Sequence, residues 1–261
     1  MKILGRRIGL RSLTILIGLG ATPFTIAASQ TLETETARLL PAKGIKFGGN
    51  FERQTSSEGR ETAVPMFFEV GLSNRTELVI EPVAYTGIRP KVGPRASGVG
   101  DLEITLVERL FVETPSRPAI ALAGEVKVPV ARNQLIGTGK ADFAGYFIAS
   151  KRFGQLDTHV NLGYTVVGRP VGVKLRNIGN FAVAAMFDVG SRTKLYSEIL
   201  ANTSATTGGE SSSTPEVSGG ELVGTLGVAQ RVNRGVTLTM GLSYDNNGAV
   251  LFRPGFTVRL F

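Results

Sequence analysis

The stretch Val236-Thr237-Leu238-Thr239-Met240-Gly241-Leu242-Ser243-Tyr244 decides the fold class. Apolar side chains occupy every second position of this stretch, and small or hydroxylated residues occupy the positions between them. A period of two belongs to the β-strand, in which successive side chains point to opposite faces. The turn at residues 245–248 and a second amphipathic segment, ending at Phe261, follow it. This end of the chain therefore predicts an amphipathic β-hairpin.

The same alternation recurs along the chain and predicts about twelve strands. It is strictest at residues 64–72, 101–110, 120–130 and 158–166, where four or five apolar residues oppose polar, charged or small ones. The other predicted strands are less regular and cover residues 45–52, 76–85, 143–151, 180–188, 194–202, 222–232 and 250–260. So many short strands and no long helical pattern predict an all-β fold.

The predicted connections alternate in length. Short ones include residues 73–75, 152–155, 190–192 and 233–235, with 113–118 nearly as short. Longer and more polar ones lie between them, at residues 55–61, 88–98, 131–140, 169–176 and 203–219. Short periplasmic turns and longer external loops are typical of a closed, antiparallel up-and-down transmembrane β-barrel. An even number of strands would then place both ends of the barrel in the periplasm.

The first 29 residues have the three parts of a secretory signal peptide. Lys2, Arg6, Arg7 and Arg11 form a basic region, residues 13–26 are mostly apolar, and residues 27–29 are small. An uncleaved membrane anchor is the alternative, but the polar Gln30 and Thr31 that follow favour cleavage. The predicted organisation is a signal peptide at 1–29, a polar lead-in at 30–42, periplasmic or acting as a plug, and a barrel at 43–261.

Composition excludes several classes of protein. Removal of residues 1–29 takes away four positive charges and no negative one, so the formal charge falls from +8 to +4. No basic run with interleaved aromatic residues remains, and nucleic acid is therefore not an expected partner. The chain has no cysteine, which excludes disulfides, thiolate metal sites and a thiol nucleophile.

The two faces of the strands predict two different surroundings. A sheet within lipid must close on itself, because an open edge would leave backbone groups without partners. We expect apolar faces to meet lipid and charged faces to line a hydrated lumen; the alternative is a solvated sheet face with cross-strand pairs. The candidate lumen-lining residues are Lys46, Glu52, Glu69, Glu81, Asp101, Glu103, Arg109, Glu125, Lys127, His159, Arg231 and Arg253.

None of these residues predicts catalysis, a cofactor or a metal. His159 is the sole histidine. A resemblance to the outer-membrane phospholipase would need a serine two residues later, where this chain has Asn161, and His159 lies on the polar face rather than the lipid face. Ion pairing with lumen lysines and arginines is the expected role of the carboxylates. We therefore predict that the protein is not an enzyme.

The last strand indicates how the barrel would be assembled in the membrane. An amphipathic strand that ends in phenylalanine is the familiar ending of outer-membrane proteins, and implies the barrel assembly machinery as a partner besides lipid. One face of this strand carries Phe252, Phe256, Val258 and Leu260. Phe261 falls out of phase with them.

Several short motifs, in order, resemble the family labelled "MetA-pathway of phenol degradation", described as outer-membrane transporters. They are Glu35 to Gly44, Gly98 to Glu103, Glu125 to Pro129 before a loop with Gly137-Thr138-Gly139, Ala141-Asp142-Phe143, and Asn161 to Tyr164. The resemblance spans residues 35–261. It implies a barrel that moves small, aromatic or hydrophobic compounds.

Two functional hypotheses follow. The first is an outer-membrane channel through which small molecules pass along a polar, charge-lined lumen, narrowed by inward-folded loops such as 88–98 or 131–140. The second is a closed structural or binding barrel, plugged by ion pairs and by residues 30–42. About twelve strands is intermediate between the smallest packed barrels and large aqueous porins, so size alone does not separate them.

Overall fold

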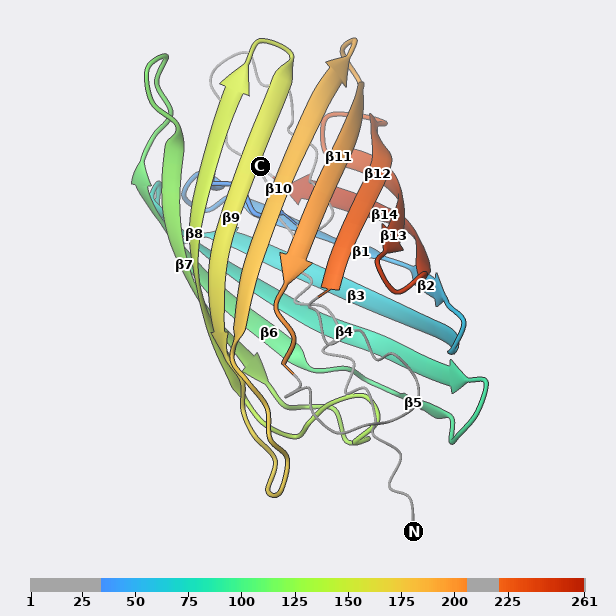
Figure 1. The fold of residues 1–261 in the computed structure, drawn as a ribbon. Helices are drawn as coiled ribbons and strands as arrows, with labels where there is room; N and C mark the ends of the chain where they lie inside the picture. Colours follow the sequence, from blue (N-terminus) through green and yellow to red (C-terminus); the bar gives the residue numbers. More distant parts are fainter. Residues whose placement is uncertain (1–33, 206–220, 261) are drawn as a thin grey trace.

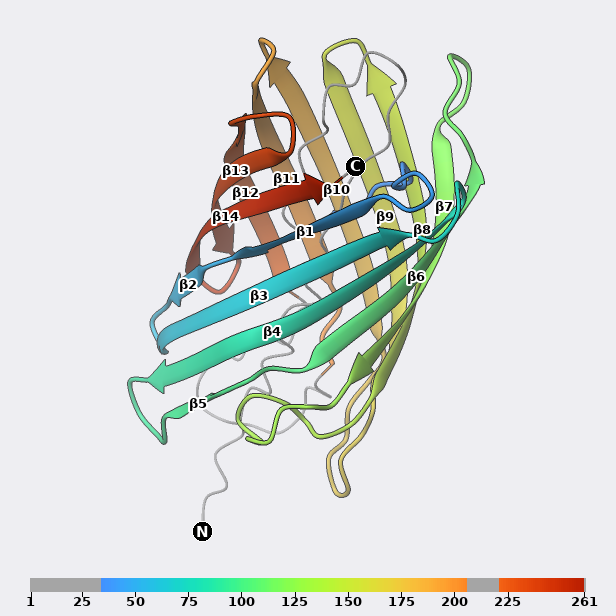
Figure 2. The same ribbon diagram turned by 180° about the vertical axis from the view of Figure 1, so that it is seen from behind.

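The computed structural model describes residues 34–205 and 221–260, which form a closed antiparallel β-barrel (Figures 1 and 2). The predicted signal peptide, residues 30–33, most of the 203–219 loop and Phe261 lie outside the described residues. The strands are β1 (Ile45–Asn50), β2 (Glu52–Thr55), β3 (Gly59–Gly71), β4 (Thr76–Pro90), β5 (Ala96–Gly98), β6 (Leu102–Phe111), β7 (Ala119–Val128), β8 (Asp142–Phe153), β9 (Leu156–Val166), β10 (Ile178–Val189), β11 (Thr193–Asn202), β12 (Glu221–Arg231), β13 (Val236–Asp245) and β14 (Val250–Leu260).

Two pairs of these segments each form one interrupted strand of the wall. The wall therefore has twelve strands, which confirms the predicted architecture. Both β1 and β2 pair with β3 on one side and β14 on the other, so they form one strand of the wall that is interrupted at Phe51. In the same way β5 and β6 both pair with β4. The barrel closes where Ile45 to Asn50 of β1 face Leu260 to Gly255 of β14. Every strand except the short β5, which pairs with β4 alone, therefore has ladder partners on both sides, as a sheet in lipid requires.

The alternation in the sequence separates the outer surface from the interior. On β13, Leu238, Met240 and Leu242 are about half exposed, whereas Thr239 and Ser243 are buried. The exposed apolar residues recur around the barrel, including Leu106, Leu122, Leu162 and Leu226. An apolar outer surface with a polar interior reverses the arrangement of a soluble barrel, and is the arrangement that favours a surrounding lipid phase.

Two connections are shorter than the sequence predicts. Residues 55–61 and 88–98 were expected to be long loops, yet β3 begins at Gly59, β4 continues to Pro90, and β5 starts at Ala96. Charged residues such as Arg60 and Arg89 make the sequence of these strand ends resemble that of loops. Backbone pairing continues through them, because Arg60 faces Arg89 in the β3–β4 ladder.

We predict that the outer face tolerates a charge only near its ends. Leu226→Arg places a cation at the middle of β12, where 68% of the side chain is exposed, and should cost about 2–4 kcal/mol of stability in a bilayer. Leu222→Arg, on the same face at the end of β12, should cost about 0–1 kcal/mol. Unfolding in urea from lipid vesicles measures both. Equal losses would contradict a lipid-facing surface.

Candidate functional site: a segment lodged in the barrel

Residues 34–42, here called the plug segment, lie inside the barrel before the chain enters β1 (blue in Figures 1 and 2). They belong to no strand. Thr34, Glu35, Ala37 and Leu40 are almost completely buried, with at most 2% of each exposed. The barrel wall is complete without this segment, so its burial comes from lying within the lumen.

Side chains of the wall satisfy the backbone of the plug segment. Asn161 of β9 accepts from the Glu35 N–H at 2.5 Å and donates to the Glu35 carbonyl at 3.0 Å. The Ala37 N–H donates to Ser150 Oγ of β8 at 2.9 Å. The Leu40 N–H donates to the Glu77 carboxylate of β4 at 2.5 Å. Because buried backbone groups need partners, these three wall residues form a binding site for an extended chain.

Arg38 holds the plug segment to two carboxylates at the end of the barrel that carries the short turns. Its guanidinium lies 2.7 Å from Glu113 Oε2, in the β6–β7 turn, and 2.8 Å from Asp157 Oδ1, at the start of β9. Two further hydrogen bonds of 2.9 Å make the contact forked on both sides. Forked, charge-assisted bonds are among the stronger polar contacts in proteins. Arg38 is therefore the main polar anchor of the segment.

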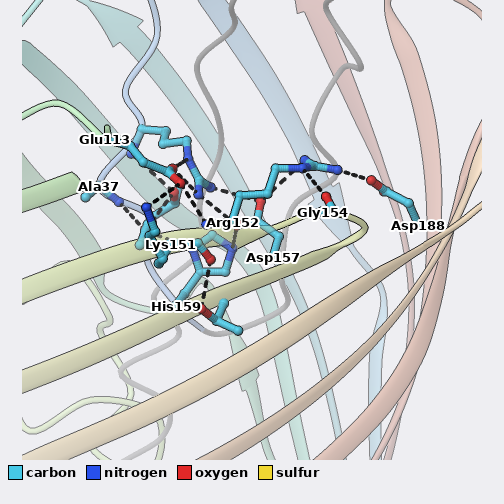
Figure 3. A network of polar contacts seen from close by, with 12 residues as sticks. Ala37, Glu113, Lys151, Arg152, Gly154, Asp157, His159 and Asp188 are labelled. Atoms are coloured by element: carbon cyan, nitrogen blue, oxygen red, sulfur yellow. Dashed lines mark hydrogen bonds and ion pairs between the residues drawn. The ribbon is translucent and has the colours of Figure 1, made fainter. Parts of the chain in front are cut away.

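The same carboxylates belong to a wider network (Figure 3). The backbone N–H of Arg152 donates to Glu113 at 2.8 Å, and Lys151 Nζ lies 3.8 Å from the same carboxylate. The Arg152 guanidinium also pairs with Asp188 of β10. Glu113 is thus held by the wall as well as by Arg38.

His159 has a serine partner that the sequence did not predict. Ser150, on the neighbouring strand β8, places its Oγ 2.9 Å from His159 Nδ1, while Asp157 Oδ1 lies 3.8 Å from Nε2. The same Ser150 Oγ accepts from the Ala37 N–H. The geometry therefore makes His159 a support for Ser150, which in turn binds the plug segment.

An apolar patch on the lumen wall receives the other side of the plug segment. Ala37 and Leu39 form one buried cluster with wall residues of β3, β4, β6, β7 and β8: Phe67, Val79, Val107, Ala119, Ala121, Ala123, Tyr146 and Ile148. On β3, β6 and β7 these wall residues stand in the phase that the sequence assigns to the polar face. The lumen, expected to be polar and charge-lined, is thus apolar at this patch. Apolar residues in the polar phase were the available sign of an internal occupant.

Several of the predicted lumen residues do pair across strands. Lys46 Nζ lies 2.5 Å from Glu69, both almost fully buried. Arg253 Nε lies 2.9 Å from Glu52 across the closing seam. Lys127 pairs with Asp142 and lies 4.0 Å from Asp101, whose carboxylate also accepts from the Ala131 N–H at 3.0 Å.

The other predicted carboxylates lie on one part of the wall. Glu81 of β4 faces Glu103 of β6, which in turn faces Lys127 of β7. Glu125 is buried and accepts from Thr105 at 3.3 Å. This part of the wall is acidic.

Arg109 and Arg231 lie at the rim rather than within the lumen. Arg109 donates to the carbonyl of Asn74, in the β3–β4 turn, and Arg231 donates to the carbonyl of Ser191, in the β10–β11 turn. Both are partly exposed. Alternation alone does not reveal where a strand leaves the lumen, and this explains the difference.

Within the described residues no group of three or more His, Asp or Glu side chains has the geometry to hold a metal ion. No helix in that part of the chain is long and apolar enough to cross a membrane.

The sequence matches no family model and no curated protein. Solved structures do match. The COG4313 outer membrane channel from Pseudomonas putida F1 is 12% identical, with a TM-score of 0.64 over 85% of this chain and 97% of that chain. The NanC porin is 8% identical, with a TM-score of 0.59 over 82% and 100%. The KdgM porin, in complex with oligogalacturonate, is 6% identical, with a TM-score of 0.54 over 82% and 99%. At these identities the likeness shows a shared fold, that of outer-membrane channels.

Proposed function

We propose that the protein is an outer-membrane channel for small molecules, and that the plug segment occludes its lumen. One observation carries this proposal: the plug segment is held in the barrel by side chains and takes no part in the ladder of the wall. It can therefore leave the lumen without breaking any strand pairing. A segment whose only role was to fill the interior would not need to be independent of the strand pairing of the wall.

The surfaces of the barrel support the same proposal. The outer face carries half-exposed leucine, phenylalanine and valine residues, whereas the interior carries buried Lys46, Glu69, Asp157, Lys194 and Glu198. Charged groups inside and apolar groups outside suit a barrel in lipid with water within. The signal peptide predicted at 1–29 and the amphipathic last strand favour export and insertion by the barrel assembly machinery.

The resemblance to the MetA-pathway family, together with the solved channels, supports passage of a small solute. The KdgM porin binds an oligogalacturonate, and that ligand is a property of KdgM. For this chain the family resemblance favours aromatic or hydrophobic compounds. The interior that such a solute would meet combines the acidic wall with the apolar patch beneath Ala37 and Leu39.

The experiment compares the mature chain with a chain that begins at Pro41, both refolded into liposomes. Pro41 is kept because its carbonyl accepts from the Gly44 N–H at 2.8 Å and so shapes the entry to β1. We expect the shortened chain to let small neutral solutes enter, seen as liposome swelling, and the mature chain to swell the liposomes much more slowly.

A second variant, with residues 34–40 replaced by a Gly-Ser sequence of equal length, guards against a folding defect in the shortened chain. Both variants should migrate on gels as heat-modifiable barrels. Folded barrels that never admit solute, with or without the plug segment, would favour the alternative of a closed structural or binding barrel. Ion pairs of the lumen such as Lys46–Glu69 are the observation that favours that alternative.

A further inference from the structure

The plug segment buries one of its carboxylates on a side of the lumen where three wall carboxylates act on it. Glu35 is 2% exposed, and its Oε1 atom has no hydrogen-bond partner. Asn161 binds both the N–H and the carbonyl of Glu35, so the backbone of Glu35 stays beside the wall while the segment is docked. The acidic groups that act on it are Glu81 and Glu77 on β4 and Glu69 on β3.

The groups that face Glu35 leave this cluster short of positive charge. Lys46 on β1 is the cation that acts on Glu35, and it already forms a 2.5 Å ion pair with Glu69. Tyr146 on β8 and Asn161 on β9 are the other polar neighbours, and both are neutral. Arg259 on β14 acts on Glu69. The Glu77 carboxylate is bound by the Leu40 N–H of the plug segment.

Buried carboxylates in such a cluster cannot all remain ionised, because each like charge opposes the next and burial removes the water that would screen them. Binding of protons neutralises buried carboxylates directly. Docking of the plug segment brings Glu35 into the cluster, so docking must change how many protons the cluster holds.

We infer that Glu35 and the wall carboxylates Glu69, Glu77 and Glu81 form a proton-binding site that couples docking of the plug segment to pH. The inference rests on the proposed function, because it concerns what opens the channel. Proton uptake favours the docked segment and closes the lumen. Proton release puts negative charge on Glu35 among the wall carboxylates and expels the segment.

The direction follows from the titration of Glu35, which belongs to the plug segment and not to a strand. Burial is the main cause that raises the pKa of Glu35 well above its ordinary value of 4.5. The charges of Glu81, Glu69 and Glu77 raise this pKa further, and the charge of Lys46 lowers it only in part. A group whose pKa is raised in the docked state favours docking fully below pH 4.5. That contribution is lost as pH rises through the raised value. The lumen should therefore open as pH increases.

The test is the open probability of the mature chain in planar bilayers between pH 5 and pH 9. For each linked proton the docking constant changes by up to about tenfold per pH unit, so opening should increase by at least tenfold over this range. Glu35→Gln removes the titrating group and should keep the lumen mostly closed throughout. Glu58→Gln, an exposed carboxylate in the β2–β3 turn, is the matched control and should behave as the parent does.

The chain that begins at Pro41 separates this inference from the proposed function. If it conducts at every pH while the mature chain shows no pH dependence, the proton coupling is wrong and the channel stands. If Glu35→Gln opens with pH as the parent does, the coupling does not pass through Glu35 and the inference is overturned. If neither the mature nor the shortened chain conducts, the proposed function itself fails.

Discussion

A disulfide between positions 37 and 150 should lock the channel shut. The Ala37 N–H donates to Ser150 Oγ at 2.9 Å, so we expect cysteines at these positions to come within bridging distance. The native chain has no cysteine, and Ala37→Cys with Ser150→Cys therefore introduces the only two thiols. We expect the oxidised double variant to pass almost no current at pH 8, and reductant to restore at least the conductance of the parent.

The two single variants are the controls, and reductant should leave their currents unchanged. Mass spectrometry verifies the disulfide before recording. Equal currents in the oxidised and the reduced protein would contradict the location of the plug segment in the conduction path. Absence of current in both states would contradict its release.

The second large effect concerns the seam at which the barrel closes. Arg253 on β14 and Glu52 on β2 form an ion pair of 2.9 Å, with 2% and 9% of their side chains exposed. Removal of one side chain breaks this buried ion pair, and breaking a buried pair costs about 3–5 kcal/mol. We expect Arg253→Met and Glu52→Gln each to lower the free energy of unfolding by about 3 kcal/mol, with a smaller loss in the double variant than in the two single variants together.

Unfolding in urea, followed by far-ultraviolet circular dichroism, measures these losses; the chain has no tryptophan to report by fluorescence. Arg53→Met is the matched control, since Arg53 is the neighbouring residue of β2 and is exposed. Its loss should stay below about 1 kcal/mol. Additive losses in the double variant would show that Arg253 and Glu52 do not stabilise the seam through their interaction with each other.

Much of the fold could be predicted from the sequence because a lipid-facing strand must alternate. All twelve predicted strands correspond to strands of the barrel wall. Strict alternation in β9 and β13 correctly predicted which side chains face outward and which face the lumen. The ends were less predictable. Residues 59–63 carry charged side chains in a region that still pairs, because hydrogen bonding along the ladder does not depend on side-chain polarity.

The site was only partly predictable, because cross-strand neighbours depend on register. Glu52, Glu69 and Lys46 were recognised as lumen residues from their phase, yet their partners came from the pairing of distant strands. The sequence suggested that residues 30–42 act as a plug, but it did not reveal Arg38, Glu113 or Asp157. These residues come from a lead-in, a turn and a strand end, where no periodic pattern exists.

The most direct test of the central claim is the single-channel conductance of the mature chain and of the chain that begins at Pro41, recorded in the same planar bilayers. A channel occluded by its own plug segment should give rare or small steps with the mature chain, and large, long-lived steps without residues 34–40. Identical steps from two verified barrels would contradict the account, as would the absence of conductance from both.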